Sequence, residues 1–176
     1  MIITCKIDTE LGTMIMGAVD DGICLLEFTD RRMLNTEYKI ISKYLKDEII
    51  EGHTVHIESI TKELREYFEG KRKSFTTPLV FTGTEFQKSV WNELLRITFG
   101  STRSYSRQAE AVGDISSVRA VANANGMNKI SIVVPCHRVI GENGHLTGYG
   151  GGLWRKRWLI DHEKKFSGQP VSLSMF

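Results

Sequence analysis

Proline and cysteine are scarce in this chain of 176 residues, which holds three of each. An odd number of widely spaced cysteines does not form a disulfide framework and is typical of a reducing, cytoplasmic setting. No apolar run approaches the roughly 18–20 residues of a membrane span, and the first residues lack the signals of a secretory leader. No period repeats, which excludes collagen, coiled coils and repeat arrays. We expect a cytoplasmic globular protein without a membrane partner.

Motifs for metals and cofactors are missing as well. The sequence contains no CxxC pair, no HExxH and no GxGxxG, so we predict neither a metal site nor a cofactor. A zinc site built from Cys5, Cys24, His53 and His56 is the weaker alternative, because Cys24 lies within an expected strand and no histidine follows it closely.

The composition is that of a globular protein, with 41% hydrophobic and 25% charged residues. The net charge of +2 is unevenly placed, however. Residues 1–83 hold 11 basic and 14 acidic residues, whereas residues 84–165 hold 12 basic and 7 acidic ones. The basic excess therefore lies in the second half, which fits a polyanionic partner for that half. Ordinary scatter of charge is the simpler alternative.

The first half has the pattern of a small sheet with helices. Runs of β-branched residues predict short strands, and Asp20-Asp21-Gly22 is a hairpin signal. Apolar residues at helical spacing predict two helices, the second ended by Gly70. A polar, basic stretch with Pro78 follows, so we expect a support domain over residues 1–78. The expected strands cover residues 2–7, 13–19, 23–28 and 54–57, and the expected helices cover 34–45 and 61–68.

The second half has the pattern of a helical domain over residues 79–166. Thr84 and Ser106 are candidate N-caps, and Gly100 and Gly113 are candidate helix ends. Two short helices joined through Gly113 suggest a helix-turn-helix, although most helical hairpins bind no DNA. The expected helices cover 84–100, 106–111, 115–125 and 153–163, with a buried strand at 130–134 and a tail at 167–176.

Cys136 calls for more than a packing role, although a free cysteine is most often a small buried hydrophobe. Pro135 restrains the backbone before it, and His137 and Arg138 follow it. Basic and cationic neighbours lower the pKa of a thiol and favour the reactive thiolate. A base at the next position of an extended segment points away from the thiol. His137 must therefore act through a turn or a bridging water, and a third group should hold its ring.

Several further segments accompany Cys136 at a specific spacing. They are Phe99-Gly100-Ser101-Thr102-Arg103-Ser104-Tyr105, Arg119-Ala120-Val121, Asn128, Pro135-Cys136-His137-Arg138-Val139, Tyr149-Gly150-Gly151-Gly152 and Trp158-Leu159-Ile160-Asp161-His162-Glu163. Together they resemble the O6-alkylguanine-DNA alkyltransferase family over residues 84–165, whereas the first half is similar only in its order of elements. The resemblance implies an α/β (α+β) fold, with a small ribonuclease-H-like sheet domain before a helical domain that holds the helix-turn-helix.

The resemblance also implies a single-turnover DNA repair activity, that of a methylated-DNA–protein-cysteine methyltransferase. Cys136 would take the alkyl group from O6 of a damaged guanine, and O4-alkylthymine is a further candidate substrate. His137 would deprotonate Cys136 through a water, and Glu163 would orient His137. Tyr105 would protonate or hydrogen-bond N3 of the leaving base. The thioether is permanent, so the protein would be consumed.

The partner that the resemblance implies is double-stranded DNA containing O6-alkylguanine, bound through its minor groove by a monomer. The damaged base must leave the stack to react, and Arg119 would fill the gap. Asn128 would tie the recognition helix to the segment that carries Cys136. The family commonly has serine at the position of Gly150, which leaves the handling of bulky alkyl groups open. The other expected binding residues are Arg138, Val139, Tyr149, Gly150 and Gly151, with Arg103 and Lys129 as candidate phosphate contacts.

Two other functions stay open on sequence alone. A non-catalytic DNA-binding protein that senses alkyl lesions would share the fold but would need no reactive cysteine, so the presence of Cys136 favours the transferase. A cysteine hydrolase using Cys136 and His137 would need an oxyanion hole, and no motif in the sequence marks one.

Overall fold

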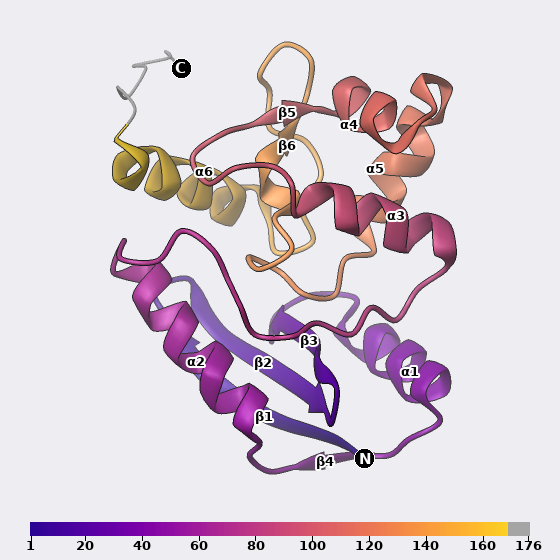
Figure 1. Cartoon of the computed structure of the whole chain (residues 1–176), viewed down its shortest axis with the longest axis vertical. Coiled ribbons are helices and arrows are strands. Elements are labelled where there is room, and N and C mark those ends of the chain that lie inside the picture. Colours follow the sequence, from indigo (N-terminus) through magenta and orange to yellow (C-terminus); the bar gives the residue numbers. More distant parts are fainter. Residues whose placement is uncertain (169–176) are drawn as a thin grey trace.

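The computed structural model describes residues 1–168, so the expected tail at 167–176 lies almost entirely outside the described residues. The first half of the chain forms a sheet with two helices, and the second half forms a group of helices beside it (Figure 1). This arrangement confirms the expected mixed α/β fold class. In chain order the elements are β1 (Ile2–Thr9), β2 (Gly12–Val19), β3 (Gly22–Phe28), α1 (Leu34–Leu45), β4 (Ile49–Glu51), α2 (Val55–Phe68), α3 (Glu85–Leu94), β5 (Arg103–Ser104), α4 (Tyr105–Val112), the 3-10 turn η1 (Ile115–Ser117), α5 (Val118–Gly126), the 3-10 turn η2 (Cys136–Arg138), β6 (Val139–Ile140) and α6 (Leu153–Ser167).

The sheet has the strand order β3-β2-β1-β4 and is mainly antiparallel, as the sequence predicts. Only β4 runs parallel to its neighbour β1. The hairpin between β2 and β3 closes where Val19 pairs with Gly22. Gly22 has a φ of +147°, and a Cβ there would press on the Pro78 carbonyl. Glycine is therefore required at this turn for both conformation and space.

Helix α2 begins earlier than the sequence predicts. The side-chain oxygen of Thr54 accepts a hydrogen bond from the Ile57 N–H at 3.2 Å and so caps the helix. Ile57 and Leu64 then lie buried on one face at helical spacing. The expected strand at 54–57 is therefore wrong, and the short strand β4 just before it was not predicted.

The edge strand β3 is buried along its whole length because other backbone segments cover it. Ile23 exchanges hydrogen bonds with Pro78 and Val80, through Ile23 N to Pro78 O (2.9 Å) and Val80 N to Ile23 O (2.8 Å). Leu26 does the same with the 129–131 segment, at 2.8 Å and 2.7 Å. The segment after α2 and the second half of the chain thus satisfy backbone groups that an edge strand otherwise exposes.

The apolar run at 130–134 is not a strand. It makes one isolated bridge to Leu26 and then turns, with the Val134 N–H donating to the Ile130 carbonyl at 3.0 Å. Ile132 even adopts a left-handed conformation, with a φ of +72°. A short buried apolar run does not by its periodicity distinguish a strand from a buried turn, which explains the wrong expectation.

Helices α3, α4 and α5 follow the expected order with shifted ends. Thr84 caps α3, as predicted, and the structure adds a capping box with Gln87. Ser104 rather than Ser106 caps α4, so that Tyr105 becomes its first residue. The expected helix from residue 115 instead begins with the η1 turn, because the Asp114 carboxylate bonds the backbone and side chain of Ser116.

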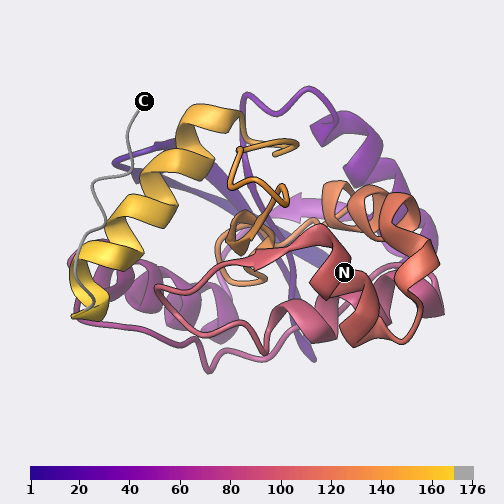
Figure 2. The same ribbon diagram turned by 90° about the horizontal axis from the view of Figure 1, so that it is seen from above.

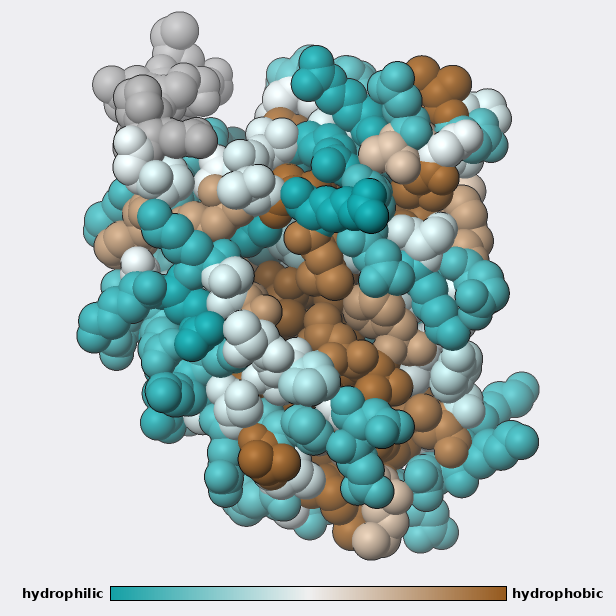
Figure 3. All heavy atoms as spheres, in the orientation of Figure 1, coloured by the Kyte–Doolittle hydropathy of each residue, from teal (hydrophilic) through white to brown (hydrophobic). Residues whose placement is uncertain are grey.

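One core runs through both halves. Buried residues of β2, β3 and α2 join those of α3, α5 and α6 in a single cluster, while a smaller cluster lies between the sheet and α1. On the face drawn in Figure 3, apolar side chains gather in the middle, over the junction of the two halves.

Seen from above, α6 lies on one side and α4 and α5 on the other, with the segment between β6 and α6 in the middle (Figure 2). Among residues 1–168, no helix is both long and apolar enough to span a bilayer.

Candidate active site

Cys136 lies in a tight turn, η2, rather than in an extended segment. Its N–H donates to the Val134 carbonyl at 2.8 Å, and the Arg138 N–H donates to the Pro135 carbonyl at 3.0 Å. Successive side chains of a 3-10 turn are rotated by about 120°, so Cys136 and His137 do not point to opposite sides as they would in a strand. The sequence left open whether His137 acts through a turn or through a bridging water, and the structure has the turn.

The Cys136 thiol is almost fully enclosed, since the residue is 9% exposed. Asn128 Nδ2 donates to Sγ of Cys136 at 3.3 Å and to the Val134 carbonyl at 2.9 Å, while its Oδ1 accepts from the Ile130 N–H at 2.9 Å. Asn128 thus joins the end of α5 to the thiol. Burial raises the pKa of Cys136 and outweighs the hydrogen bond from Asn128. The expected lowering of the thiol pKa is therefore wrong for this state, and the thiol needs a base.

His137, the residue after Cys136, forms a buried pair with Glu163. His137 Nε2 lies 2.6 Å from Oε1 of Glu163. Burial lowers the pKa of His137 despite the carboxylate, so the ring is neutral near pH 7. When Nε2–H donates to Glu163, Nδ1 is the basic nitrogen, and within residues 1–168 this buried atom has no hydrogen-bond partner. The ring is therefore held in place with its basic nitrogen free.

Glu163 accepts hydrogen bonds from both halves of the molecule. Arg138 donates through Nε at 2.8 Å and Nη2 at 3.0 Å, and the Gly100 N–H donates at 3.1 Å. From α2, the Tyr67 hydroxyl donates to Oε1 at 2.9 Å. Burial alone would raise the pKa of Glu163, but the adjacent His137 and Arg138 hold it well below its usual range. The carboxylate is therefore ionised and fixed.

Arg138 does not lie on the substrate-binding surface that the sequence predicts. It is 6% exposed, and Nη1 donates to the Ile97 carbonyl at 2.5 Å while the other nitrogens bond Glu163. The η2 turn directs this side chain into the interior. Its charge balances the Glu163 carboxylate rather than a phosphate or a base.

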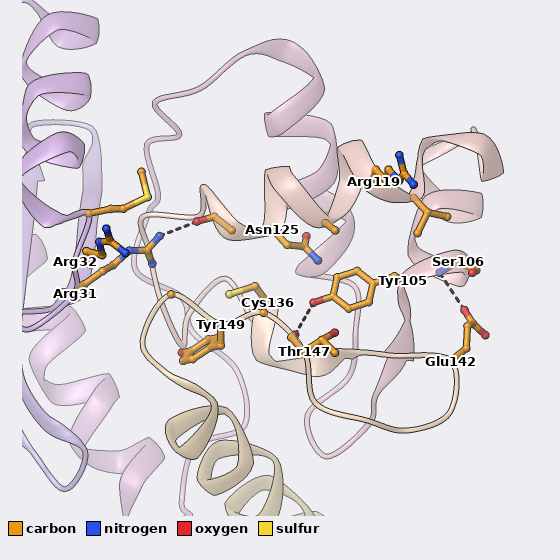
Figure 4. A pocket seen from close by; sticks show the side chains of 16 residues that line it. Arg31, Arg32, Tyr105, Ser106, Arg119, Asn125, Cys136, Glu142, Thr147 and Tyr149 are labelled. Atoms are coloured by element: carbon orange, nitrogen blue, oxygen red, sulfur yellow. Dashed lines mark hydrogen bonds between the residues drawn. The ribbon is translucent and has the colours of Figure 1, made fainter.

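A pocket of about 690 Å³ opens beside Cys136 (Figure 4). Helices α4 and α5 form one wall, the segment after η2 forms a second, and the connection between β3 and α1 forms a third. Of the expected site residues, the pocket brings together Cys136, Tyr105, Arg119, Tyr149 and Gly150. These residues come from positions up to 45 apart in the sequence, and the fold alone joins them.

Tyr105 and Arg119 differ in how firmly they are held. The Tyr105 hydroxyl donates to the Thr147 carbonyl at 3.0 Å, and burial raises its pKa, so it is a neutral donor at the pocket wall. Arg119 is exposed near the start of α5, on the pocket rim in Figure 4. The first is placed to touch a bound molecule, and the second is free to reach outward from the pocket.

Val139 and Gly151, like Asn128 and Arg138, do not line the pocket. The Val139 side chain is buried, and its N–H already donates to the Cys136 carbonyl. Gly151 lies behind the wall, where a Cβ would come within 2.9 Å of the Phe28 and Tyr149 rings. Gly150 alone of the two glycines faces the pocket.

Lys129 and Arg103 are not placed as phosphate contacts. Lys129 is 4% exposed, and its Nζ donates to the Thr82 carbonyl at 2.8 Å. Nη1 of Arg103 bonds the side chains of Glu93 at 3.0 Å and Gln108 at 2.9 Å. Both cations are engaged within the protein.

Residues of the first half that were not predicted also reach the site, among them Arg31 and Tyr67. Arg31 lines the pocket with Cys136, and Tyr67 bonds Glu163. The only available signal was Glu27, an acidic residue within the apolar strand at 23–28, which indicates a buried partner. Nothing in the sequence identifies that partner as Arg31.

The zinc alternative finds no support in the geometry. Cys24 packs in the cluster between the sheet and α1, whereas Cys5 packs against the main core on the other side. The two thiols are free, and burial raises the pKa of Cys24 to about 12. Residues 1–168 contain no group of three or more histidine, cysteine or acidic side chains that could hold a metal ion.

Family models match both halves of the chain. Residues 2–81 match the model described as "6-O-methylguanine DNA methyltransferase, ribonuclease-like domain", and residues 85–165 match the model of the DNA binding domain of the same proteins. The two matches together span nearly all described residues.

Curated relatives and solved structures are similar to the chain. The inducible methylated-DNA–protein-cysteine methyltransferase of Bacillus subtilis is 50% identical over 64% of this chain and 63% of its own length, slightly under two thirds. The methylated-DNA–protein-cysteine methyltransferase of Methanosarcina acetivorans is 39% identical over 89% of this chain and 94% of its own length. The crystal structure of Mycobacterium tuberculosis OGT in complex with DNA has a TM-score of 0.81 at 34% identity and covers 96% of each chain.

Proposed function

The chain belongs to the 6-O-methylguanine DNA methyltransferase family, and on this premise we propose that it repairs DNA directly, by moving the alkyl group of O6-alkylguanine to Cys136. The observation that carries this proposal is the enclosed Cys136 thiol, which borders a pocket and is followed in the chain by His137 of the buried His137–Glu163 pair. A neutral histidine whose ring is held by a carboxylate can act as the general base that activates a thiol.

The proposed reaction is an in-line displacement. Through one water, Nδ1 of His137 takes the Cys136 proton, and Glu163 stabilises the resulting imidazolium. Sγ attacks the alkyl carbon, the new S–C bond forms as the C–O6 bond breaks, and the electron pair passes to the guanine ring. The Tyr105 hydroxyl turns from the Thr147 carbonyl and donates its one proton to N3 of the leaving base. Because a thioether does not leave at neutral pH, each protein molecule reacts once.

The proposed partner is double-stranded DNA, bound in the minor groove by a helix-turn-helix formed by α4, η1 and α5. Arg119 fills the gap left by the flipped base. Its exposed position on the pocket rim and the basic excess of residues 84–165 support this assignment. Minor-groove readout is nearly blind to sequence, which suits a repair protein.

We further propose that the two halves of the chain have different roles. Residues 1–78 support the site, and residues 79–166 bind DNA and react. One thiol and one alkyl group require a single copy, so the protein acts as a monomer. A reduced Cys136 requires a reducing compartment, which agrees with the cytoplasm.

Titration of the protein with a duplex oligonucleotide that carries one O6-methylguanine tests the proposal. We expect guanine to be restored in the DNA up to one equivalent per protein and then no further. The alternative function, a sensor of alkyl lesions, predicts tight binding with the methyl group left on the DNA.

Cys136→Ser is the matched control for this titration. The hydroxyl preserves the size of the side chain, so DNA binding should be nearly unchanged while methyl loss stops. Repair that continues in Cys136→Ser would overturn the assignment of the nucleophile.

A further inference from the structure

Arg31, a residue of the first half, occupies the space beside Gly150 in the pocket wall. An ideal Cβ at position 150 would lie 2.9 Å from Nη2 of Arg31 and closer still to its Nη1 and Cζ. The φ of Gly150 is outside the left-handed region, so the backbone itself accepts any residue. The guanidinium of Arg31 is therefore what limits position 150.

The Arg31 guanidinium cannot easily move aside. Nη1 lies 2.6 Å from Oε2 of Glu27, Nε lies 2.9 Å from Oε1 of Glu37, and Nη2 donates to the Gly126 carbonyl at 2.7 Å. Oε2 of Glu27 is held in turn by the Ser131 hydroxyl at 2.7 Å. The arginine and both carboxylates are buried, so displacing the cation would leave two buried acids without it.

The pocket consequently has a fixed cation in its wall. Figure 4 shows the Arg31 guanidinium across the pocket from Tyr105, on the side toward which the Cys136 sulfur points. An alkyl group that is transferred to this sulfur must come close to that side. A small alkyl group fits beside this wall, whereas a large one would press on a side chain that Glu27, Glu37 and the Gly126 carbonyl hold in place, which is unfavourable.

We propose that Arg31 is a specificity-determining residue of the alkyl-transfer site, which favours methyl over bulky apolar alkyl groups and requires glycine at position 150. This inference rests on the proposed function and extends it to the class of substrate. It also assigns a direct part in the pocket to the first half of the chain.

The test compares single-turnover transfer to Cys136 from two duplexes, one with O6-methylguanine and one with O6-benzylguanine. Arg31→Met, combined with Glu27→Gln and Glu37→Gln to avoid unpaired charges, should raise the ratio of benzyl to methyl rate constants about tenfold, as expected for a changed apolar pocket. Arg72→Met is the matched control, since Arg72 pairs with Glu63 and Glu66 away from the pocket. It should leave the ratio unchanged.

Gly150→Ser provides a second test that does not depend on the triple variant folding. In the native background it should slow methyl transfer about tenfold, since overpacking a site commonly costs this much. In Arg31→Lys, which keeps the charge but lacks the planar fork, the same substitution should cost much less. Equal costs in both backgrounds, or a benzyl-to-methyl ratio unchanged in the folded triple variant, would overturn the proposal for Arg31. Absence of any transfer by the native protein would instead overturn the proposed function.

Discussion

The two halves of the molecule differ in what they contribute to the site. The second half carries the groups proposed to react, Cys136, His137 and Tyr105, and it holds the basic excess. The first half is net acidic and carries no reacting group, yet Tyr67 bonds Glu163 and Arg31 bonds the end of α5. The first half therefore helps to fix the geometry of the site, although none of its residues is proposed to react.

The second half also stabilises the first. Arg155 at the start of α6 donates to the Leu11 carbonyl at 2.8 Å and pairs with Asp30 at 2.8 Å. Ser131 bonds the buried Glu27 of β3. Each half supplies hydrogen-bond partners to polar groups that the other half buries. The halves are therefore expected to unfold together, and variants that destabilise one half should also destabilise the other.

Glu163→Gln should have the largest effect on both halves at once. The amide leaves Arg138 buried without its counter-charge, which costs about 3–5 kcal/mol in the free energy of unfolding. Loss of the His137 partner should slow methyl transfer about 100-fold or more. Urea unfolding and single-turnover kinetics measure the two effects. Glu69→Gln, which alters an exposed pair with Lys71, should leave stability nearly unchanged, and an equal loss in both variants would contradict this account.

Arg119→Ala should separate DNA handling from chemistry within the second half. Arg119 is proposed to fill the place of the flipped base. Without it, flipping should cost a few kcal/mol more, which lowers the rate constant on duplex DNA about 10–100-fold. The reaction with free O6-methylguanine base should be unchanged, because no stack has to be opened. Parallel kinetics on duplex and free base give the comparison. Equal impairment on both would show that Arg119 acts in the pocket itself.

Methylation of Cys136 should weaken the contact between α5 and the η2 turn. The new methyl group meets Nδ2 of Asn128, which lies 3.3 Å from Sγ and also bonds the Val134 carbonyl. Overpacking of this kind costs about 1–3 kcal/mol, which corresponds to a melting temperature lower by several degrees. Calorimetry before and after reaction measures the shift. An unchanged melting temperature would mean that the site has room for the methyl group.

Tyr67→Phe tests the support that comes from the first half. The ring stays in the core, but Glu163 loses one of its donors, so unfolding should become easier by about 1 kcal/mol. Methyl transfer should slow only slightly, since Arg138 and Gly100 still hold the carboxylate. Tyr44→Phe, on the exposed side of α1, is the control and should change neither. A large loss of rate without loss of stability would place Tyr67 in the reaction.

The pH dependence should show the smallest effect, a broad plateau. Burial lowers the pKa of His137, so the base stays neutral as the pH falls through 6.5 and is lost only below it. Burial raises the pKa of Cys136, so no free thiolate builds up at pH 7–8 to add to the rate. Single-turnover rate constants from pH 6.5 to 8 should agree within about twofold. A tenfold rise per pH unit would instead indicate direct reaction of a free thiolate.

Local signals account for what the sequence predicted well. The three first strands and the N-cap at Thr84 depend on neighbouring residues, and the structure places them as expected. The expected strands at 54–57 and 130–134 failed because short β-branched runs are equally compatible with a buried helix start or turn. At residues 54–57, the side-chain cap from Thr54 stabilises the start of a helix instead.

Long-range pairs could not be predicted from the sequence. Arg31 bonds a carbonyl 95 residues away, and Tyr67 bonds a carboxylate 96 residues away. The inward direction of Arg138 depends on Glu163, which belongs to another element. Such buried polar partners are set by how the two halves pack, and no local pattern encodes that packing.

The mass of the intact protein, measured before and after incubation with duplex DNA that contains O6-methylguanine, tests the central claim most directly. We predict a gain of one methyl group that saturates at one per molecule and maps to the peptide with Cys136. An unchanged mass while the DNA stays bound would contradict the transfer and leave Cys136 as a structural residue.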